Sequence, residues 1–350
     1  MISSLIVTLV AVVTLTAATN GPPPGYDPKL VAWNKKTKSG FLGRLETTGV
    51  DVPHVCWFNV RSIHAERFEI PTYNDWPENT DGPLADGIVD ATNPTPGCSQ
   101  NPPFYSVVQP RAPLTSPAPG FSETDCLGLT ICRPYGALDD EDRNTIMYVH
   151  GGSNSVGMAA IATPFNLTVA TNSVTFSLQY RLNIFGFWGG NWALYDVRYQ
   201  FCWIHEFGKF FGAKTKYETT AAIAVSAGFL NTHTELISNI KCPGDTKVKK
   251  LYSTLIAGDP WQGDTLPVQG AIPQGRTNSL DVDIAVALGC LPTTTSGVTT
   301  LSPAVKACMK LIPTATLQVA GFNGVNTWTD FATTNVNVPW CFGPVVDGVT

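Results

Sequence analysis

A serine flanked by small residues follows a short apolar run in T-A-A-I-A-V-S-A-G-F, residues 220–229. Small residues two positions before and two positions after a serine are typical of a nucleophile elbow, a sharp strand-to-helix turn that exposes the hydroxyl. The pattern here is Ala224-x-Ser226-x-Gly228, with alanine where such turns usually carry glycine. The end of a buried strand would show the same pattern. Ser226 is therefore a candidate nucleophile, and a second motif is needed to support a catalytic site.

A glycine-rich turn, H-G-G-S-N-S-V-G at residues 150–157, could supply that second element. Glycine lets the backbone approach a ligand and point N–H groups at it. Acyl transfer to serine needs such donors around the developing oxyanion, and losing one donor raises the barrier by about 3 to 4 kcal/mol. A tight loop that needs glycine only for its dihedral angles is the alternative reading of this motif.

Both candidate turns follow apolar runs rich in β-formers. T-I-M-Y-V-H ends before Gly151, and A-A-I-A-V ends before Ser226. Further strands are expected in L-G-L-T-I-C-R-P, residues 127–134, and in N-S-V-T-F-S-L-Q-Y, residues 172–180. Near-continuous apolar strands are typical of central strands covered on both faces. Since open α/β sheets place their sites at the ends of such strands, Ser226 is expected to face the 150–157 turn.

The segment at residues 191–211 has aromatic residues spaced by three or four positions, which predicts a helix ending at Gly212. Its aromatic stripe is interpreted as core packing, not as a cofactor site. Residues 20–120 are dense in Pro, Gly, Asn and Thr, which favours turns and extended segments. Strands that alternate with helices predict an α/β fold with a mostly parallel central sheet flanked by helices.

Composition limits the classes of function. The chain has 350 residues, a net charge of -5 and only 22 basic residues, so nothing indicates nucleic-acid binding. Residues 1–18 form an apolar run ending in small residues, which predicts a secretory signal peptide and a secreted mature chain at 19–350. A short membrane anchor is the alternative for the first segment. No later run approaches 18 apolar residues, so no membrane span is expected in the mature chain.

Nine cysteines in a secreted chain are expected to form disulfides in part, and the odd number leaves at least one unpaired. The sequence contains no C-x-x-C pair, so we expect no zinc site and assign no metal. The sequon Asn166-Leu167-Thr168 is a candidate glycosylation site if its loop is exposed.

Ordered motifs along most of the chain resemble the type-B carboxylesterase, cholinesterase and lipase family of α/β-hydrolases. The matching segments are E-R-F-E-I-P (66–71), Cys98-Ser99-Gln100, S-E-T-D-C-L-G-L (122–129), M-Y-V-H-G-G-S (147–153), Q-Y-R-L-N-I-F-G-F (179–187), G-N-W-A-L-Y-D (190–196) and, late in the chain, A-L-G-C, A-C-M-K-L-I-P and G-P-V-V-D-G. The succession of these motifs in the family's order carries the resemblance.

The resemblance implies a role for several residues. Ser226 would be the nucleophile of an acyl-enzyme mechanism without a cofactor, acting on a small-molecule or lipid ester. The oxyanion would be held by backbone N–H groups. These belong to Gly152, Ser153 and Ala227. Two disulfides are implied as well, Cys98 with Cys126 and Cys290 with Cys308, which leaves five cysteines without an assigned partner.

The sequence also departs from the family. Ala224 and Val225 stand where the family has glycine and glutamate beside the nucleophile. A serine needs a histidine to accept its proton and an acid to orient that histidine, in the chain order Ser, acid, His. After Ser226 the only histidine is His233, and no acid lies between them. The family's acid and histidine lie in its C-terminal third, so the resemblance implies that these 350 residues correspond to the family's N-terminal two thirds, as a truncated or misjoined gene product would.

Two functions are therefore expected from the sequence. The first is a secreted carboxylic-ester hydrolase that is inactive or weak as this incomplete chain. The second is a non-catalytic binding or adhesion module built on the same fold, which the missing base and Val225 favour. The ester specificity and the oligomeric state are not predicted.

Overall fold

The computed structural model describes most of the chain, with gaps between the described segments. The described residues are 21–47, 53–76, 86–100, 120–137, 141–152, 154–160, 165–215, 220–225, 239–245, 254–258, 272–292, 301–327 and 345–346. The expected signal peptide at 1–18 lies outside these residues. So do Ser153, Ser226 and Ala227.

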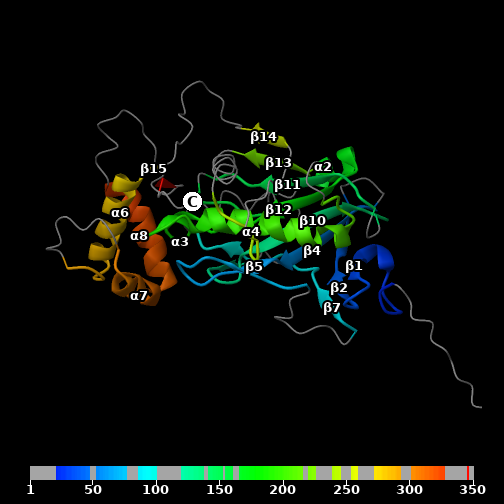
Figure 1. Ribbon diagram of the computed structural model, residues 1–350, viewed down its shortest axis with the longest axis horizontal. Helices are drawn as coiled ribbons and strands as arrows, with labels where there is room; N and C mark the ends of the chain where they lie inside the picture. The colour runs from blue at the N-terminus through cyan, green and yellow to red at the C-terminus, as the bar shows by residue number, and fades with distance from the viewer. Residues whose placement is uncertain are drawn as a thin grey trace, which may run out of the picture.

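A seven-stranded sheet in the order β14-β13-β11-β12-β10-β4-β3 forms the centre of the molecule (Figure 1). Its strands are β3 (Arg44–Thr47), β4 (Pro53–Arg61), β10 (Gly128–Pro134), β11 (Thr145–Val149), β12 (Val174–Leu178), β13 (Thr220–Val225) and β14 (Thr254–Gly258). The pairs from β12 to β14 are parallel, and β10 and β3 run against their neighbours. Five of the seven strands thus run in one direction, which confirms the mostly parallel sheet.

Helices cover both faces of this sheet. Successive residues of a strand point to opposite faces, so each face carries side chains on which a helix can pack. Trp57 of β4 packs in a cluster with Phe165 of α2 (Phe165–Thr171), whereas the next residue, Phe58, joins the main core. The main core also contains Phe201 and Trp203 of α4 (Trp192–Phe207). The two helices therefore lie on opposite faces, and the expected α/β fold is confirmed.

The helix predicted at 191–211 is present as α4 followed by the 3-10 helix η3 (Gly208–Phe211). It ends at Gly212, whose φ of 81° is left-handed. The strands expected near 127–134, 145–150, 172–180 and 221–225 are β10, β11, β12 and β13. The nine-residue strand β4 was not predicted, because it lies in a region rich in turn-forming residues.

Shorter elements complete the described part of the fold. A three-stranded sheet of β1, β2 and β7 flanks the central one, and α3, α6, α7 and α8 gather at the other end of the molecule (Figure 1). These and the remaining elements are η1 (Pro28–Leu30), β1 (Val31–Asn34), β2 (Ser39–Leu42), β5 (Ile63–His64), β6 (Thr72–Tyr73), β7 (Ile88–Asp90), β8 (Gly97–Cys98), β9 (Phe121–Ser122), α3 (Asn183–Phe187), β15 (Ile272–Pro273), α6 (Gln274–Ala287), α7 (Pro303–Leu311), α8 (Thr314–Thr327) and β16 (Val345–Val346). In the segments described, no helix has the length and apolar character needed to cross a membrane.

Three disulfides cross-link the described chain. Cys98 bonds to Cys126 and Cys290 to Cys308, the pairs that the resemblance implies. A third bond, between Cys202 of α4 and Cys242, was not predicted, and both of its cysteines are buried in the main core. It closes a longer loop than the other two, with a sequence separation of 40 against 28 and 18.

Removing this third disulfide should cost more stability than removing Cys290–Cys308. Loop closure predicts a loss of about 4 kcal/mol for the variant Cys202→Ala/Cys242→Ala and about 3 kcal/mol for Cys290→Ala/Cys308→Ala, since the entropy restored to the unfolded chain grows with loop length. Urea unfolding of both variants measures the order. An equal or reversed order would mean that packing around the sulfur atoms, not loop closure, sets the cost.

A buried carboxylic acid is the other feature that sets stability. Asp281 of α6 is 2% exposed, and its Oδ2 accepts a hydrogen bond from the Gly189 N–H at 2.9 Å. Its backbone carbonyl accepts another from the Trp188 indole N–H at 3.1 Å. Burial raises the pKa of Asp281 from 3.8 to about 8, although the hydrogen bond from Gly189 opposes the rise. Asp281 is therefore neutral in the fold at pH 7.

Asp281→Asn should stabilise the protein in a pH-dependent way. Between pH 4 and pH 8 the folded state keeps this acid protonated while the unfolded state ionises it, so the wild type loses stability as the pH rises through that window. The amide does not ionise, and it keeps an oxygen for the Gly189 N–H. We expect a gain of about 2 kcal/mol at pH 8 and little change at pH 4 by urea unfolding. A change of the same size at both pH values would contradict this assignment.

Candidate active site

The two candidate turns follow neighbouring strands. β11 and β13 are adjacent and parallel, and Val149 is in register with Ala224. The described part of β13 ends at Val225, directly before Ser226, and β11 ends directly before His150. Parallel strands in register end at the same edge of the sheet. The chain therefore leaves β11 for the 150–157 turn and leaves β13 toward Ser226 at the same edge of the sheet. Ser226 itself lies outside the described residues.

The turn after β11 is built around Gly152. Its φ is +119°, a region that residues with a Cβ rarely adopt. A Cβ at this position would lie 1.9 Å from the carbonyl oxygen of Val156. That crowding arises because Ser155 and Val156 both donate backbone hydrogen bonds to the Gly152 carbonyl, at 2.9 and 3.0 Å. Only glycine fits here without displacing the backbone. The conformation of the turn therefore depends on glycine at position 152.

Gln100 holds the far end of the turn. Its side-chain amide accepts a hydrogen bond from the Gly157 N–H at 3.0 Å and donates one to the Gly157 carbonyl at 2.9 Å. Gln100 lies two residues after Cys98, so the Cys98–Cys126 disulfide fixes the segment that carries it. Gly157, with a φ of +125°, leaves room for the His150 ring, whose Nδ1 would lie 2.4 Å from a Cβ. Gln100 was recognised in the sequence only as part of the motif Cys98-Ser99-Gln100. Its support of the turn was not predicted.

His150 is part of the support of the turn. Its ring stacks on Tyr180 with centroids 4.5 Å apart, and the Tyr180 hydroxyl donates to the His150 carbonyl at 2.8 Å. Nδ1 lies 2.8 Å from the Gly151 carbonyl. Burial lowers the pKa of His150 to about 4, against a smaller opposing effect of the Gly151 hydrogen bond. The ring is thus neutral at pH 7, and its stacking on Tyr180 fixes it against the turn.

A buried ion pair anchors the segment behind the turn. Arg181 and Asp196 make two parallel hydrogen bonds of 2.8 Å, from Nε to Oδ2 and from Nη2 to Oδ1, and the Arg181 N–H also donates to Asp196 Oδ2. Their side chains are 2% and 0% exposed. Two residues further on, the Asn183 N–H donates to the carbonyl of Asn154 within the turn. The motifs around residues 181 and 196 pointed to this region, but their pairing was not predicted.

Asn166, the candidate glycosylation site, is exposed in the first turn of α2. The third residue of its sequon, Thr168, is buried and donates its hydroxyl to Thr175 of β12 at 2.9 Å. A glycan on Asn166 would therefore point away from the contact that docks the helix. Within the described segments, no group of three or more His, Cys, Asp or Glu side chains is arranged to hold a metal ion.

Comparisons with known proteins agree with this geometry. The model of the carboxylesterase family matches residues 63–349. Carboxylesterase 5A of Mus musculus is 29% identical over 218 residues, which are 59% of this chain and 35% of that protein. Acylcarnitine hydrolase of Mus musculus is 28% identical over 121 residues, or 33% of this chain and 21% of that protein.

A solved structure supports the fold. A thermophilic pNB esterase superposes with a TM-score of 0.64 at 17% sequence identity, covering 91% of this chain and 57% of its own. The matched segments thus span about a third or less of the two curated relatives and little more than half of this structure. The family model matches residues 63–349, which are most of the chain, and the chain therefore belongs to the carboxylesterase family.

Proposed function

We propose that this chain carries the nucleophile and the oxyanion-binding turn of a secreted carboxylic-ester hydrolase. The observation that carries the proposal is the parallel register of β11 and β13, which starts the Gly152 turn and Ser226 from the same sheet edge. In the proposed reaction, the Ser226 hydroxyl adds to the ester carbonyl and the alcohol leaves with a proton. Water then hydrolyses the acyl-enzyme.

The oxyanion of each step would be held by the N–H groups of Gly152, Ser153 and Ala227. Such donors stabilise the transition state more than the substrate, because full negative charge develops only there. The hydrogen bonds of Gln100 and Tyr180 keep the turn in shape before the substrate arrives. The substrate class is a small-molecule or lipid ester, and the reaction needs no cofactor. The expected signal peptide at 1–18, the mature domain at 19–350 and the glycan at Asn166 belong to this proposal.

A non-catalytic binding module is the second candidate. It is favoured by Val225 in the position before the serine and by the absence, within these 350 residues, of an acid and a histidine in the order that a triad requires. The fold and the turn would then be retained for their shape alone. The two candidates differ in whether Ser226 reacts.

Labelling with a fluorophosphonate probe separates the candidates. If the turn stabilises an oxyanion at Ser226, the probe should modify Ser226 in preference to the other serines, as located by peptide mass spectrometry, and should do so slowly because no base assists. Ser226→Ala should abolish this adduct, and Gly152→Ala should reduce it at least tenfold. Modification spread evenly over the serines, or equal in the native and the urea-unfolded chain, would support the binding module.

Gly136→Ala is the matched control for Gly152→Ala. Gly136 also has a left-handed φ, of +87°, but a Cβ there meets no atom within 4 Å. Both variants therefore carry the backbone strain of alanine at a positive φ, and only Gly152→Ala adds the clash with Val156. Unchanged labelling in Gly136→Ala assigns the loss in the other variant to the shape of the turn.

A further inference from the structure

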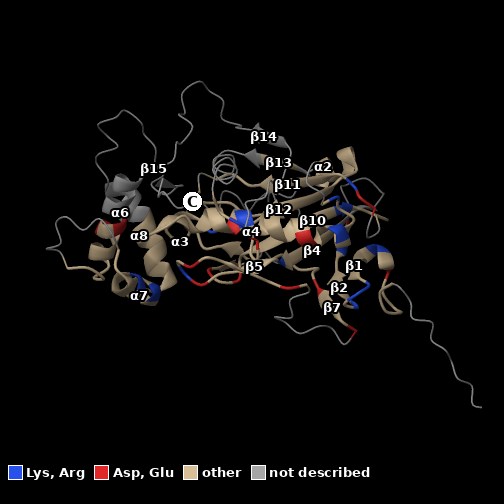
Figure 2. Cartoon of the chain, in the orientation of Figure 1, with Lys and Arg blue, Asp and Glu red and all other residues tan. Residues whose placement is uncertain are grey.

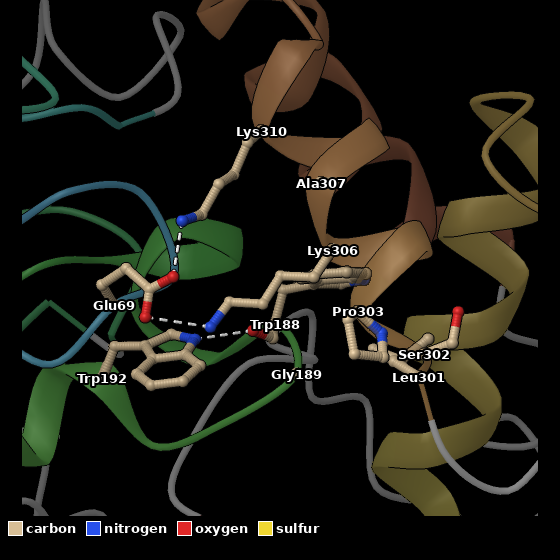
Figure 3. A pocket seen from close by; sticks show the side chains of 10 residues that line it. All are labelled: Glu69, Trp188, Gly189, Trp192, Leu301, Ser302, Pro303, Lys306, Ala307 and Lys310. Atoms are coloured by element: carbon tan, nitrogen blue, oxygen red, sulfur yellow. Dashed lines mark hydrogen bonds and ion pairs between the residues drawn. The ribbon is translucent and has the colours of Figure 1, made fainter.

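A cavity of about 450 Å³ lies between three segments that belong neither to the 150–157 turn nor to β13 (Figure 3). The segments are the loop before β6, the connection between α3 and α4 with the first residue of α4, and α7 with the two residues before it. The lining residues are Glu69, Trp188, Gly189, Trp192, Leu301, Ser302, Pro303, Lys306, Ala307 and Lys310. The volume falls in the lower part of the range of small-molecule sites.

The Trp192 indole gives this cavity an aromatic surface, whereas Trp188, which also borders the cavity, is only 1% exposed. The indole N–H of Trp192 donates to the Trp188 carbonyl at 2.7 Å, and that of Trp188 donates to the Asp281 carbonyl. Both indole N–H groups therefore already have acceptors, and the Trp192 ring is left to offer flat apolar surface to the cavity. Leu301 adds apolar surface on the α7 side of the cavity. A planar apolar group would find complementary surface here.

The polar groups of the cavity leave one positive charge in excess. Lys306 and Lys310, one turn apart on α7, both form ion pairs with Glu69 (Figure 3), and Figure 2 shows basic residues in blue on α7. The Lys306 ammonium also lies 4.8 Å from the centroid of the Trp192 ring. All three charged side chains are one third to two fifths exposed, at 31, 35 and 41%. They are hydrated at the rim, so the lysines can turn toward a ligand without a large desolvation cost.

We propose that this cavity binds a small aromatic carboxylate, with its ring against Trp192 and its carboxylate shared between Lys306 and Lys310. An anion fits because two ammonium groups face a single carboxylate, and charge-assisted hydrogen bonds to carboxylates are the strongest that lysine makes. A cation would meet like charge from the two lysines. The aromatic ring fits because the Trp192 indole and Leu301 line the cavity. Glu69 is then a competitor of the ligand for the same two lysines.

The test compares three ligands of one shape by isothermal titration calorimetry on the 350-residue chain. 2-Naphthoate carries the carboxylate, 2-naphthylmethanol is neutral, and 2-naphthylmethylammonium is a cation. We expect naphthoate to bind at least tenfold more tightly than the alcohol, with the cation weakest, and we expect the difference to shrink in 0.5 M salt. Equal binding of acid and alcohol, or no binding of naphthoate at 5 mM to chain whose fold is verified by circular dichroism, would overturn the proposal.

Three variants locate the binding. Lys306→Met/Lys310→Met should weaken naphthoate at least tenfold, and Lys241→Met, at another exposed lysine, should leave it unchanged. Glu69→Gln should strengthen naphthoate three- to tenfold, because it frees both lysines. If Glu69 instead holds the lysines in a binding geometry, Glu69→Gln weakens binding and the proposal fails. Should the double lysine variant not fold, the Glu69→Gln result and the three-ligand comparison still decide.

Discussion

A polypeptide of these 350 residues is expected to hydrolyse a short-chain nitrophenyl ester at no more than about 10³ to 10⁴ times the uncatalysed rate, which is what serine hydrolases retain without a working triad. The Ser226 proton has no acceptor in the required chain order. Two histidines of the described segments are already engaged. His150 is buried with a pKa of about 4, and both ring nitrogens of His64 are hydrogen-bonded, to Asn74 and Thr72. Loss of the base costs other serine hydrolases about 10⁶-fold in kcat.

The measurement is release of nitrophenolate by the wild type and by Ser226→Ala at pH 7 to 8. We expect the two rates to differ by less than about tenfold, because without a base the hydroxyl contributes little beyond the oxyanion-binding turn. Robust turnover by the wild type that Ser226→Ala abolishes would show that a base is present in these 350 residues. His233, seven residues after Ser226, would then be the first to replace.

Asp196→Asn is expected to lower the free energy of unfolding by about 3 to 5 kcal/mol, because it leaves the Arg181 guanidinium buried without a counter-charge. Arg181 is 2% exposed, so it cannot reach water without opening the core around α4. A loss of this size is a large part of the 5 to 15 kcal/mol that stabilises a typical domain. Urea unfolding followed by far-UV circular dichroism gives the value.

Two controls separate burial from charge. Asp125 forms a surface ion pair with Arg61 at 3.8 Å and is 56% exposed, so Asp125→Asn should cost less than about 1 kcal/mol. The apolar double variant Arg181→Met/Asp196→Leu should recover most of the loss, since it removes both charges from the core. If Asp196→Asn costs no more than Asp125→Asn, the buried pair does not hold α4 in place.

The sequence predicted the four central strands β10, β11, β12 and β13 and missed the other three strands of the sheet, β14, β4 and β3. β10, β11, β12 and β13 are apolar runs bounded by turn residues, so their local pattern reveals them. β4 mixes His, Cys, Asn and Arg with its apolar residues, and its seven-residue pairing with β10 is a contact between distant parts of the chain. Local patterns do not carry such long-range pairing. For the same reason the third disulfide, across 40 residues, could not be selected among nine cysteines.

The sequence predicted the part of the site that depends on backbone conformation. Gly152 is recognisable because its left-handed φ and its contact with Val156 demand glycine. The residues that support the turn are ordinary polar and aromatic side chains whose roles depend on distant partners. Gln100 and Tyr180 meet the turn across separations of 57 and 30 residues. The roles of Ser226, Ser153 and Ala227 stay predictions, because these residues lie outside the described segments.

Gln100 also connects the turn to a helix that is synthesised much later. Its side chain grips Gly157, and its carbonyl accepts a hydrogen bond from Gln318 of α8, 218 residues later, at 3.1 Å. A chain that emerges from the ribosome N-terminus first has β11 and the turn long before α8. Contacts of such high sequence separation form late, because the loop entropy must be overcome first. The hydrogen bond from α8 to Gln100 can therefore form only after the residues that hold Gln100 and Tyr180 against the turn have been synthesised.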